Sequence, residues 1–325
     1  MIKTKNIIGD VQRTSKKYNI LTFNTHERYQ SQLAKTGHNF YAFMHEGAKD
    51  WYSGHAPMPE NYYVLPKNSL FSAINFDFIL SNSKFGQFQI SEQINRTLQI
   101  PVISLEHTLP LSSWPDSQMK SYQNMKGDID VFITKYSMGE WGMGGEVVYH
   151  SIDTELFRPD PEAKREGVLT VAHDFKNRDY ALNYQGWERI TKDLPRKVVG
   201  ETEGLSKQSE SVEHLVKEYQ NSLVYINPST LSPVPTSMLE AMSCGCAVVT
   251  TATCEMPNII NNGENGFISN DEEELRGYIQ KLLADPELAK EMGESARETI
   301  KNLFSEDRFI EEWNTIFNKA YEVKK

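Results

Sequence analysis

The chain has 325 residues, a mass of 37.3 kDa and a formal net charge of −10, from 34 Lys and Arg against 44 Asp and Glu. This length is typical of two domains, and the negative charge argues against general binding to nucleic acid. Hydrophobic residues make up 39% of the sequence, which is a globular composition. The cysteines lie in one short stretch, and no apolar run reaches the length that spans a bilayer. The sequence therefore predicts a soluble, cytoplasmic protein.

Strand-length apolar runs alternate with helix-like segments through the first half of the chain. These β-branched and aromatic runs lack polar alternation, which is typical of parallel strands covered on both faces. The Pro-, Gly- and Tyr-rich stretch Lys49–Asn68 is predicted to be a long loop. We expect strands at Tyr18–Phe23, Asn39–Phe43, Phe76–Leu80, Pro101–Leu105, Asp130–Thr134 and Glu146–His150, and helices at Ser31–Thr36, Gln87–Leu98 and Ser137–Trp141.

A second series of the same kind begins after Pro159, Asp160 and Pro161, which break local structure. Its alternation of strands and helices predicts a second doubly wound α/β domain with a parallel sheet. We expect strands at Val168–Ala172, Lys197–Val199, Leu223–Asn227, Ala247–Thr251 and Phe267–Ser269, and helices at Tyr180–Lys192, Ser211–Tyr219, Thr236–Ser243, Glu272–Ala284 and Pro286–Asn302.

These series predict an N-terminal domain at residues 1–155, a C-terminal domain at residues 156–305 and a C-terminal helix at residues 306–325. Apolar residues of the last segment, among them Phe309, Trp313 and Phe317, recur at helical spacing and form one apolar face. Two placements are open for this helix. It either caps the second domain or crosses back and packs on the first.

The stretch Leu223–Thr251 carries the strongest local signal for a binding site. Its loop enters a helix at Pro235, whose missing N–H is of no consequence there, and Thr236 or Ser237 can cap that helix. The free amides and the dipole at a helix start favour an anion such as a phosphate. Glu240, one turn into the helix, could accept hydrogen bonds from the hydroxyls of a ribose. The alternative is an ordinary helix start with Glu240 in solvent.

The same stretch resembles the signature of the retaining, GT-B-fold glycosyltransferases of family four, the glycosyl transferases group 1. The resemblance implies two Rossmann-like domains that face a cleft. It also implies transfer of a sugar from a nucleotide-diphosphate-sugar to an acceptor hydroxyl with retention of anomeric configuration, with no metal or other cofactor. The matching segments lie between residues 146 and 320 and include Ser151–Asp153, Phe157–Pro159, Val198–Glu201, Asn227–Ser229, Leu239–Met242, Cys244–Gly245, Ala247–Val249, Pro257–Ile260 and Asn262–Phe267.

The resemblance assigns donor-binding roles to residues around the start of the predicted helix Thr236–Ser243. Glu240 matches a Glu that binds the ribose, and Thr236, Ser237 and Met238 match the helix start whose amides contact the diphosphate and the sugar. Ser232 stands where the family has another Glu, which contacts the donor sugar. The sugar subsite is therefore expected to differ from that of the family, and a weakly active or non-catalytic relative that binds a sugar nucleotide is one alternative.

Basic residues after the first strand of the second domain are the expected partners of the donor diphosphate. The resemblance places His173 and Arg178 where the family has an Arg and a Lys, and Lys176 lies between them. Arg178 keeps the charge, can bind phosphate through two hydrogen bonds, and is predicted to stabilise charge as the sugar–phosphate bond breaks. The alternative for Lys176 and Arg178 is a turn in solvent.

The first domain offers candidates for catalysis and for acceptor binding. His107 ends a predicted strand, where an imidazole can orient a hydroxyl or take a proton, and a purely structural role is the alternative. The resemblance gives this position to a His that contacts the donor sugar. His26, Glu27 and Arg28 follow the first strand and are predicted to bind the acceptor.

The expected partners are a UDP- or GDP-linked sugar and a glycan, lipid-linked or other hydroxyl acceptor, with peripheral membrane contact as a further expectation. Asp128-Ile129-Asp130 has the D-x-D form of metal-dependent glycosyltransferases of another fold, but no metal site is predicted. A second alternative is a transferase that acts on a nucleic-acid base, although the net charge argues against it. The basic cluster that suggests it comprises Lys3, Lys5, Arg13, Lys16 and Lys17.

Overall fold

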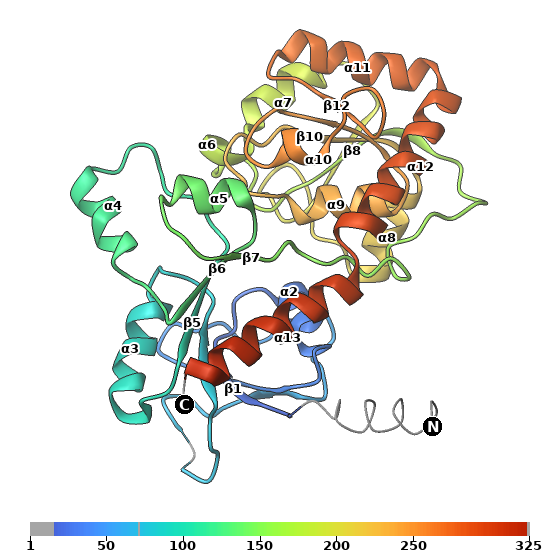
Figure 1. Ribbon diagram of the computed structural model, residues 1–325. Coiled ribbons are helices and arrows are strands. Elements are labelled where there is room, and N and C mark those ends of the chain that lie inside the picture. Colours follow the sequence, from blue (N-terminus) through green and yellow to red (C-terminus); the bar gives the residue numbers. More distant parts are fainter. Residues whose placement is uncertain (1–15, 71, 324–325) are drawn as a thin grey trace, which may run out of the picture.

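The computed structural model describes residues 16–70 and 72–323, which form two α/β domains built on separate parallel sheets (Figure 1). Every strand pair in both sheets is parallel. The predicted α/β class with two doubly wound domains is therefore confirmed. Of the basic cluster considered above, Lys3, Lys5 and Arg13 lie outside the described residues, and Lys16 lies over the ring of Tyr321.

Seven strands form the first sheet, in the order β3-β2-β1-β4-β5-β6-β7. All residues of β4 and β5 are buried, which is why their sequences show no polar alternation. The direction of strand addition reverses between β1 and β4, and ligands of open α/β sheets bind at such a switch point. The strands are β1 (Asn19–Thr22), β2 (Asn39–Ala42), β3 (Tyr62–Val64), β4 (Phe78–Ser81), β5 (Val102–Glu106), β6 (Ile129–Phe132) and β7 (Glu146–Val147).

Two helices of the first domain begin at side-chain caps. His26 caps the helix after β1, because its Nδ1 accepts the amide of Tyr29 at 3.3 Å. Thr134 caps the helix after β6 by accepting the amide of Ser137 at 2.9 Å. Both caps lie after the carboxyl ends of strands, so they place these two helix starts at the same edge of the sheet. The helices are α2 (Glu27–Ala34), α3 (Gln87–Leu98), α4 (Asp116–Gln123) and α5 (Lys135–Glu140).

Five strands form the second sheet, in the order β12-β11-β10-β8-β9. Its central strand, β10, is buried over all six residues, and the switch point lies between β8 and β10. The loops that carry the predicted donor site leave these two strands. The strands are β8 (Glu166–Val171), β9 (Arg196–Val199), β10 (Ser222–Asn227), β11 (Ala247–Thr250) and β12 (Phe267–Ile268).

One helix of the second domain is broken where the sequence predicted a continuous one. Asn183 has a φ of 54° and its side chain accepts the amide of Gly186, so the predicted helix Tyr180–Lys192 is wrong and consists of two short helices. Asn tolerates this left-handed conformation better than most residues. The helices are α6 (Asp179–Leu182), α7 (Tyr184–Ile190), α8 (Val212–Gln220), α9 (Thr236–Ser243), α10 (Met256–Ile259), α11 (Glu272–Ala284) and α12 (Pro286–Leu303).

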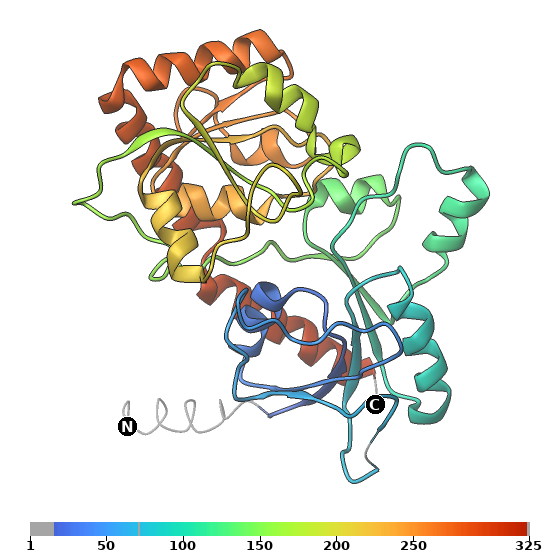
Figure 2. The ribbon, with the colours of Figure 1, turned by 180° about the vertical axis from the view of Figure 1, so that it is seen from behind.

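The last helix, α13 (Glu306–Val323), leaves the second domain and lies along the first (Figures 1 and 2). Trp313 is fully buried and its Nε1 donates to the hydroxyl of Tyr29 on α2 at 3.1 Å. The ring of Phe317 stacks on that of Phe78 with 5.9 Å between centroids. These contacts make α13 part of the apolar core of the first domain.

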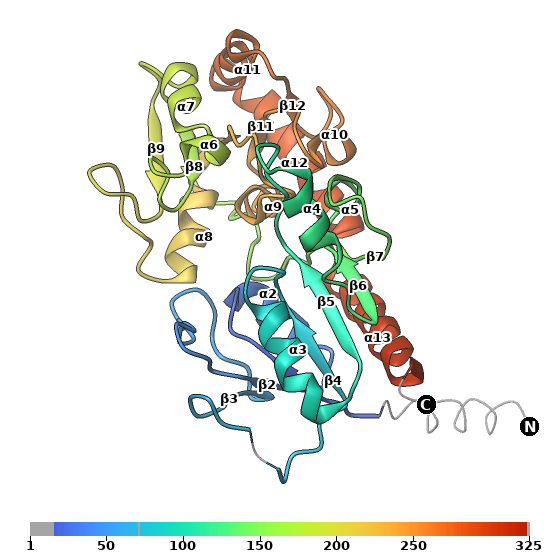
Figure 3. The ribbon, with the colours of Figure 1, turned by 90° about the vertical axis from the view of Figure 1, so that its left-hand side faces the viewer.

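Two connections join the domains, and they lie side by side. The amide of Ile152, in the outgoing connection, donates to the carbonyl of Phe304, in the returning one, at 3.0 Å. Arg308, in the first turn of α13, donates to the carbonyls of Tyr149 and His150 at 3.0 and 2.8 Å. Figure 3 shows the domains stacked, with α13 running down the side of the first.

The structure adds three elements that the sequence did not predict. The prediction of a loop over Lys49–Asn68 is partly wrong, because Tyr62–Val64 pairs with β2 as the edge strand β3. Helix α4 has no buried residue, and α10 contains only four residues, so neither has the apolar periodicity that indicates a helix. Within the described ranges, no helix combines the length and the apolar character needed to cross a membrane.

Replacing the aromatic anchor of α13 should destabilise the first domain. We expect Trp313→Ala to lower the free energy of unfolding by about 3–5 kcal/mol, because the large cavity it leaves lies between α13 and α2. Urea denaturation followed by circular dichroism measures this loss. The control Glu311→Ala, on the exposed face of the same helix, should stay within about 0.5 kcal/mol of the wild type, and equal losses in both variants would contradict the assigned packing.

Candidate functional site

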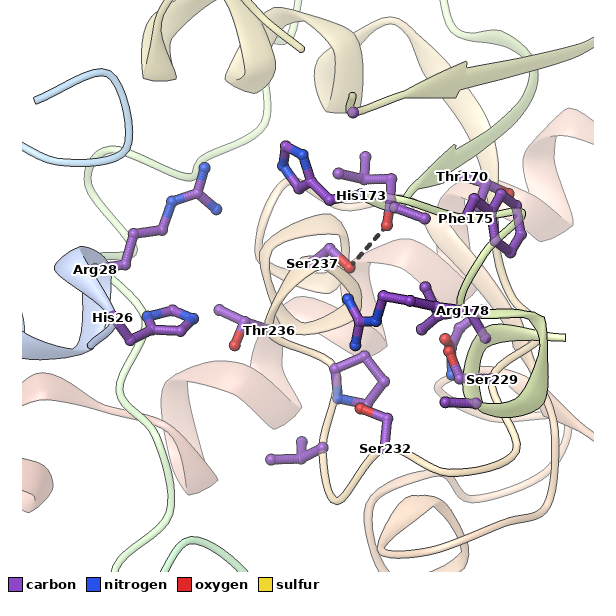
Figure 4. Close-up of a pocket in the computed structure, with 18 of the residues that line it drawn as sticks. His26, Arg28, Thr170, His173, Phe175, Arg178, Ser229, Ser232, Thr236 and Ser237 are labelled. Carbon is purple, nitrogen blue, oxygen red and sulfur yellow. Dashed lines mark hydrogen bonds between the residues drawn. The ribbon is translucent and has the colours of Figure 1, made fainter. Parts of the chain in front are cut away.

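The carboxyl ends of the two sheets meet at a cleft with a volume of about 730 Å³. Loops that follow β1 and β5 line it from the first domain, and loops that follow β8 and β10 line it from the second. Figure 4 shows His26 and Arg28 on one side, opposite Arg178, Thr236 and Ser237. A volume of this size is typical of small-molecule and cofactor sites.

The start of α9 forms one wall of the cleft. Pro235 precedes the helix, and Thr236 and Ser237 are its first two residues and line the cleft. The hydroxyl of Ser237 donates to the carbonyl of Val171 at 3.3 Å and accepts from Tyr225 at 2.8 Å, which ties the helix start to β8 and β10. The amides of Thr236 and Ser237 come too early in the helix to reach a carbonyl within it, so this wall favours an anion.

Arg178 and His173 lie on the same wall, after β8. Figure 4 shows the guanidinium of Arg178 directed toward Thr236 and Ser237. The Nδ1 of His173 accepts the amide of Glu201 at 3.1 Å, so its proton is on Nε2. Burial, followed by the positive charges of neighbours that include Arg28 and Arg178, lowers the pKa of His173. The imidazole is therefore a neutral hydrogen-bonding group, and Arg178 carries the charge of this wall.

Lys176 and Met238, both predicted to bind the donor, lie away from the cleft lining. The Nζ of Lys176 donates to the carbonyls of Glu203 and Gly204 at 3.2 and 3.4 Å. Met238 is fully buried, and its amide donates to the carbonyl of Pro235 at 3.1 Å. These contacts fix a turn and the first turn of α9, so the structure does not bring either side chain to the other predicted residues.

Three histidines gather on the first-domain wall. The rings of His26 and His107 are nearly parallel, with 6.4 Å between their centroids, and His107 and His150 are 6.1 Å apart. Tyr29 packs edge-on against His107 and His150, at 4.6 and 5.2 Å. Burial, followed by neighbouring charges, lowers the pKa of His26 to about 4 and that of His150 to about 3, and it lowers the pKa of His107 as well. All three rings are therefore neutral near pH 7.

Arg28 and Glu240 form an ion pair across the domain interface. Nη1 of Arg28 donates to Oε1 of Glu240, and the hydroxyl of Tyr219 donates to Oε2 at 2.8 Å. Glu240 is only 1% exposed, so the alternative of a solvated carboxylate is wrong. The pair lines a second cavity of about 530 Å³, which shares Thr236, Arg28 and His26 with the cleft. Both carboxylate oxygens that the resemblance assigns to a ribose are occupied here.

The remaining first-domain candidate, Glu27, is held by its own domain. Its carboxylate accepts from the amide of Tyr52 at 3.2 Å and lies 3.0 Å from Nδ1 of His55. Among the described residues that line the cleft, Glu27 is the only carboxylate. Ser232 lines the opposite wall, so the position that the family gives to a sugar-binding Glu holds a hydroxyl.

Two histidines of the cleft were absent from the sequence-based predictions. His150 ends the predicted strand Glu146–His150, and the rule that selected His107, a His at the carboxyl end of a strand, would also have selected it. His55 lies within the predicted loop and gave no such signal. His150 is 5% exposed, and its Nε2 has no hydrogen-bond partner.

The D-x-D segment and two of the cysteines take part in the internal packing and hydrogen bonding of the protein. Asp128 accepts the amide of Val102 at 2.8 Å, and Asp130 lies 3.7 Å from the buried ammonium of Lys84. Cys244 and Cys246 are fully buried. No cluster of His, Cys, Asp or Glu suited to a metal ion occurs within residues 16–70 and 72–323.

The second domain is similar to known sequences. Residues 205–299 match the family described as glycosyl transferases group 1. An uncharacterized glycosyltransferase of Haemophilus influenzae is 27% identical over 178 residues, which are 46% of this chain and 48% of the relative. N-acetyl-alpha-D-glucosaminyl L-malate synthase of Bacillus anthracis is 32% identical over 82 residues, 25% of this chain and 22% of the relative. The chain thus matches less than half the length of these curated relatives.

Solved structures resemble the whole arrangement of the two domains. Sucrose-phosphate synthase of Thermosynechococcus elongatus superimposes with a TM-score of 0.72 and 14% identity, over 94% of this chain and all of that one. HepE of Anabaena, in complex with UDP and glucose, superimposes with a TM-score of 0.73 and 12% identity, over 93% and 99% of the two chains. At these identities the likeness shows the fold, and that fold is GT-B.

The buried imidazole of His150 should make stability depend on pH. Because its pKa is lower in the folded state, the unfolded chain binds more protons between about pH 3 and 6.5, and the free energy of unfolding falls as the pH drops. We expect His150→Gln to remove about 2 kcal/mol of the loss between pH 7 and pH 5. Urea denaturation at both pH values measures it, and an unchanged pH dependence in the variant would contradict a buried neutral imidazole.

Proposed function

We propose that this chain, whose residues 205–299 match the glycosyl transferases group 1 and which has the GT-B fold, moves a sugar from a nucleotide-diphosphate-sugar to an acceptor hydroxyl. The observation that carries this proposal is the position of Arg178 beside the start of α9, on the cleft wall that faces the first domain. Helix amides and a guanidinium are the groups that bind a diphosphate best.

The donor is proposed to be a UDP- or GDP-linked sugar. The HepE structure contains UDP and glucose, which supports UDP as the first nucleotide to test. Ser232, in place of a carboxylate, gives the sugar subsite a neutral hydroxyl. The acceptor is proposed to be a glycan, a lipid-linked molecule or another hydroxyl compound, bound beside His26 and Glu27 on the first domain.

The proposed reaction retains the anomeric configuration and uses no metal. As the sugar–phosphate bond breaks, Arg178 and the α9 amides stabilise the charge that develops on the diphosphate. The neutral imidazole of His107 orients a hydroxyl at the reacting centre. Glu27, the carboxylate on the cleft wall, is engaged by His55 and Tyr52, so it is a poor nucleophile. The leaving diphosphate therefore takes the acceptor's proton on the same face of the sugar.

A second candidate is a relative that binds a sugar nucleotide and transfers little or nothing. It is favoured by Ser232 and by the Arg28–Glu240 pair, which both reduce the polar contacts open to a donor. Donor binding without transfer or hydrolysis would support it. Salt-sensitive binding of duplex DNA or RNA would instead favour a transferase acting on a nucleic-acid base, and binding to anionic vesicles would indicate peripheral membrane contact.

Removing the charge of Arg178 should weaken the binding of nucleoside diphosphates. We expect Arg178→Ala to raise the dissociation constant at least about ten-fold, because a charge-assisted hydrogen bond to phosphate is lost. Calorimetric titration with UDP, GDP, ADP and CDP, with and without EDTA, measures it and identifies the nucleobase, and the metal-free mechanism predicts that EDTA has no effect.

Lys176→Ala is the matched control, since this residue lies two positions away and its ammonium bonds to backbone carbonyls. Its effect on affinity should be small. Equal losses in the two variants, or an unchanged affinity in Arg178→Ala, would contradict the diphosphate site. Product from the paired sugar nucleotide, examined by NMR of the anomeric proton, tests retention.

A further inference from the structure

Arg28 stands between the two cavities of the domain interface. It is the second residue of α2, and its side chain lines both the cleft and the smaller cavity behind it. Its Nη1 donates to Glu240, and its Nε donates to the carbonyl of His55 at 3.4 Å. The Arg28 side chain is 25% exposed against 1% for Glu240, so the guanidinium has room to leave the pair and the carboxylate does not.

Glu240 cannot stay unpartnered where it lies. A buried carboxylate that loses its cation is strongly destabilising unless other donors replace the lost contact. Tyr219 supplies one donor, to Oε2, and Arg28 supplies the contact to Oε1. Glu240 lies one helical turn beyond Thr236, and both residues line the second cavity. A pair of adjacent hydroxyls, on a ligand whose phosphates occupy the helix start, can replace Arg28 at Oε1.

The cleft is short of cations for a diphosphate as long as Arg28 stays in its pair. The Lys and Arg residues among the described residues of its lining are Arg28, Lys49 and Arg178. Arg178 is the one on the second-domain wall, next to the helix start, whereas Lys49 comes from the first domain. A nucleoside diphosphate carries at least two negative charges, so a second guanidinium at this wall would bind it more tightly.

We propose that Arg28 exchanges partners when the donor binds: it leaves Glu240 for the diphosphate, and the ribose hydroxyls take its place at the Glu240 carboxylate. The inference rests on the proposed function and deepens it. In the empty protein the guanidinium neutralises Glu240, and in the complex it becomes the second cation of the leaving group. Because Arg28 belongs to the first domain, the exchange also makes that domain a direct partner of the phosphates bound by the second.

The exchange predicts opposite effects of one substitution on two ligands. A nucleoside has the ribose but no phosphate, so it must displace Arg28 without offering it a new partner. A nucleoside diphosphate offers both. Removing the guanidinium should therefore favour the nucleoside and disfavour the diphosphate, whereas a purely structural Arg28 would affect both ligands in the same direction.

The test compares wild type and Arg28→Met by calorimetry, with UDP, GDP, ADP and CDP and the four matching nucleosides. We expect Arg28→Met to weaken the diphosphate that binds the wild type about ten-fold or more. We expect it to tighten binding of the matching nucleoside several-fold. Arg178→Met is the control, because it should weaken the same diphosphate and leave the nucleoside unchanged.

The outcomes distinguish failure of the partner exchange from failure of the proposed function. Changes in the same direction for both ligands, or no change in either, would overturn the exchange even if the proposed function holds. If no diphosphate binds the wild type, the proposed function itself fails, and this inference fails with it. Circular dichroism checks that the variant folds. If Arg28→Met does not fold, Arg28→Lys, which keeps the charge but not the planar fork, should show the same opposite changes at smaller amplitude.

Discussion

The site depends on one geometric constraint, that the carboxyl ends of two parallel sheets are held facing each other. A parallel sheet brings all of its functional loops to one edge, so each domain alone offers half of a site. The outgoing connection near Ile152 and the returning one near Phe304 are hydrogen bonded to each other, and Arg308 binds the former from the start of α13. With α13 packed on the first domain through Trp313, the two half-sites remain opposed.

The two walls of the cleft offer different groups to a ligand. His26, His107 and His150 are kept neutral by burial and by neighbouring charges, so the first-domain wall presents hydrogen-bonding groups that can orient hydroxyls. The charge of the opposite wall is on Arg178, beside the start of α9. This division suits a reaction in which negative charge develops on a leaving diphosphate while an uncharged hydroxyl attacks.

Much of the second domain could be predicted from the sequence, because local signals and tertiary structure agree there. Helices α9 and α11 begin and end at the predicted residues. The predicted cap of α9 is wrong, because Pro235 stands at the N-cap and neither Thr236 nor Ser237 caps the helix. The helix α10 was missed, since its four residues make only one turn and carry too little periodicity. In the first domain, the edge strand β3 was missed because it lies in the Pro-, Gly- and Tyr-rich stretch that predicted a loop. The break at Asn183 was missed because Asn within an apolar helical pattern indicates a left-handed residue only weakly.

Several residues of the candidate site could be predicted from the sequence, but the contacts between them could not. The sequence placed Arg178, Ser232, Thr236, Ser237 and His107 at the carboxyl ends of strands, and all of them line the cleft. It could not show that Arg28 and Glu240, 212 positions apart, form an ion pair, because their contact exists only through the arrangement of the two domains. Lys176 lies next to the predicted site in sequence, but its side chain bonds to a neighbouring turn instead.

In the proposed function, the first turn of α9 and Arg178 hold the diphosphate of a nucleotide-sugar donor in the cleft between the domains. The most direct measurement is a crystal structure of the protein grown with the nucleoside diphosphate that binds most tightly. We expect both phosphates within hydrogen-bonding distance of Arg178 and of the amides at Thr236 and Ser237. Phosphates bound elsewhere on the protein, with this cleft wall left without contact to the ligand, would contradict it.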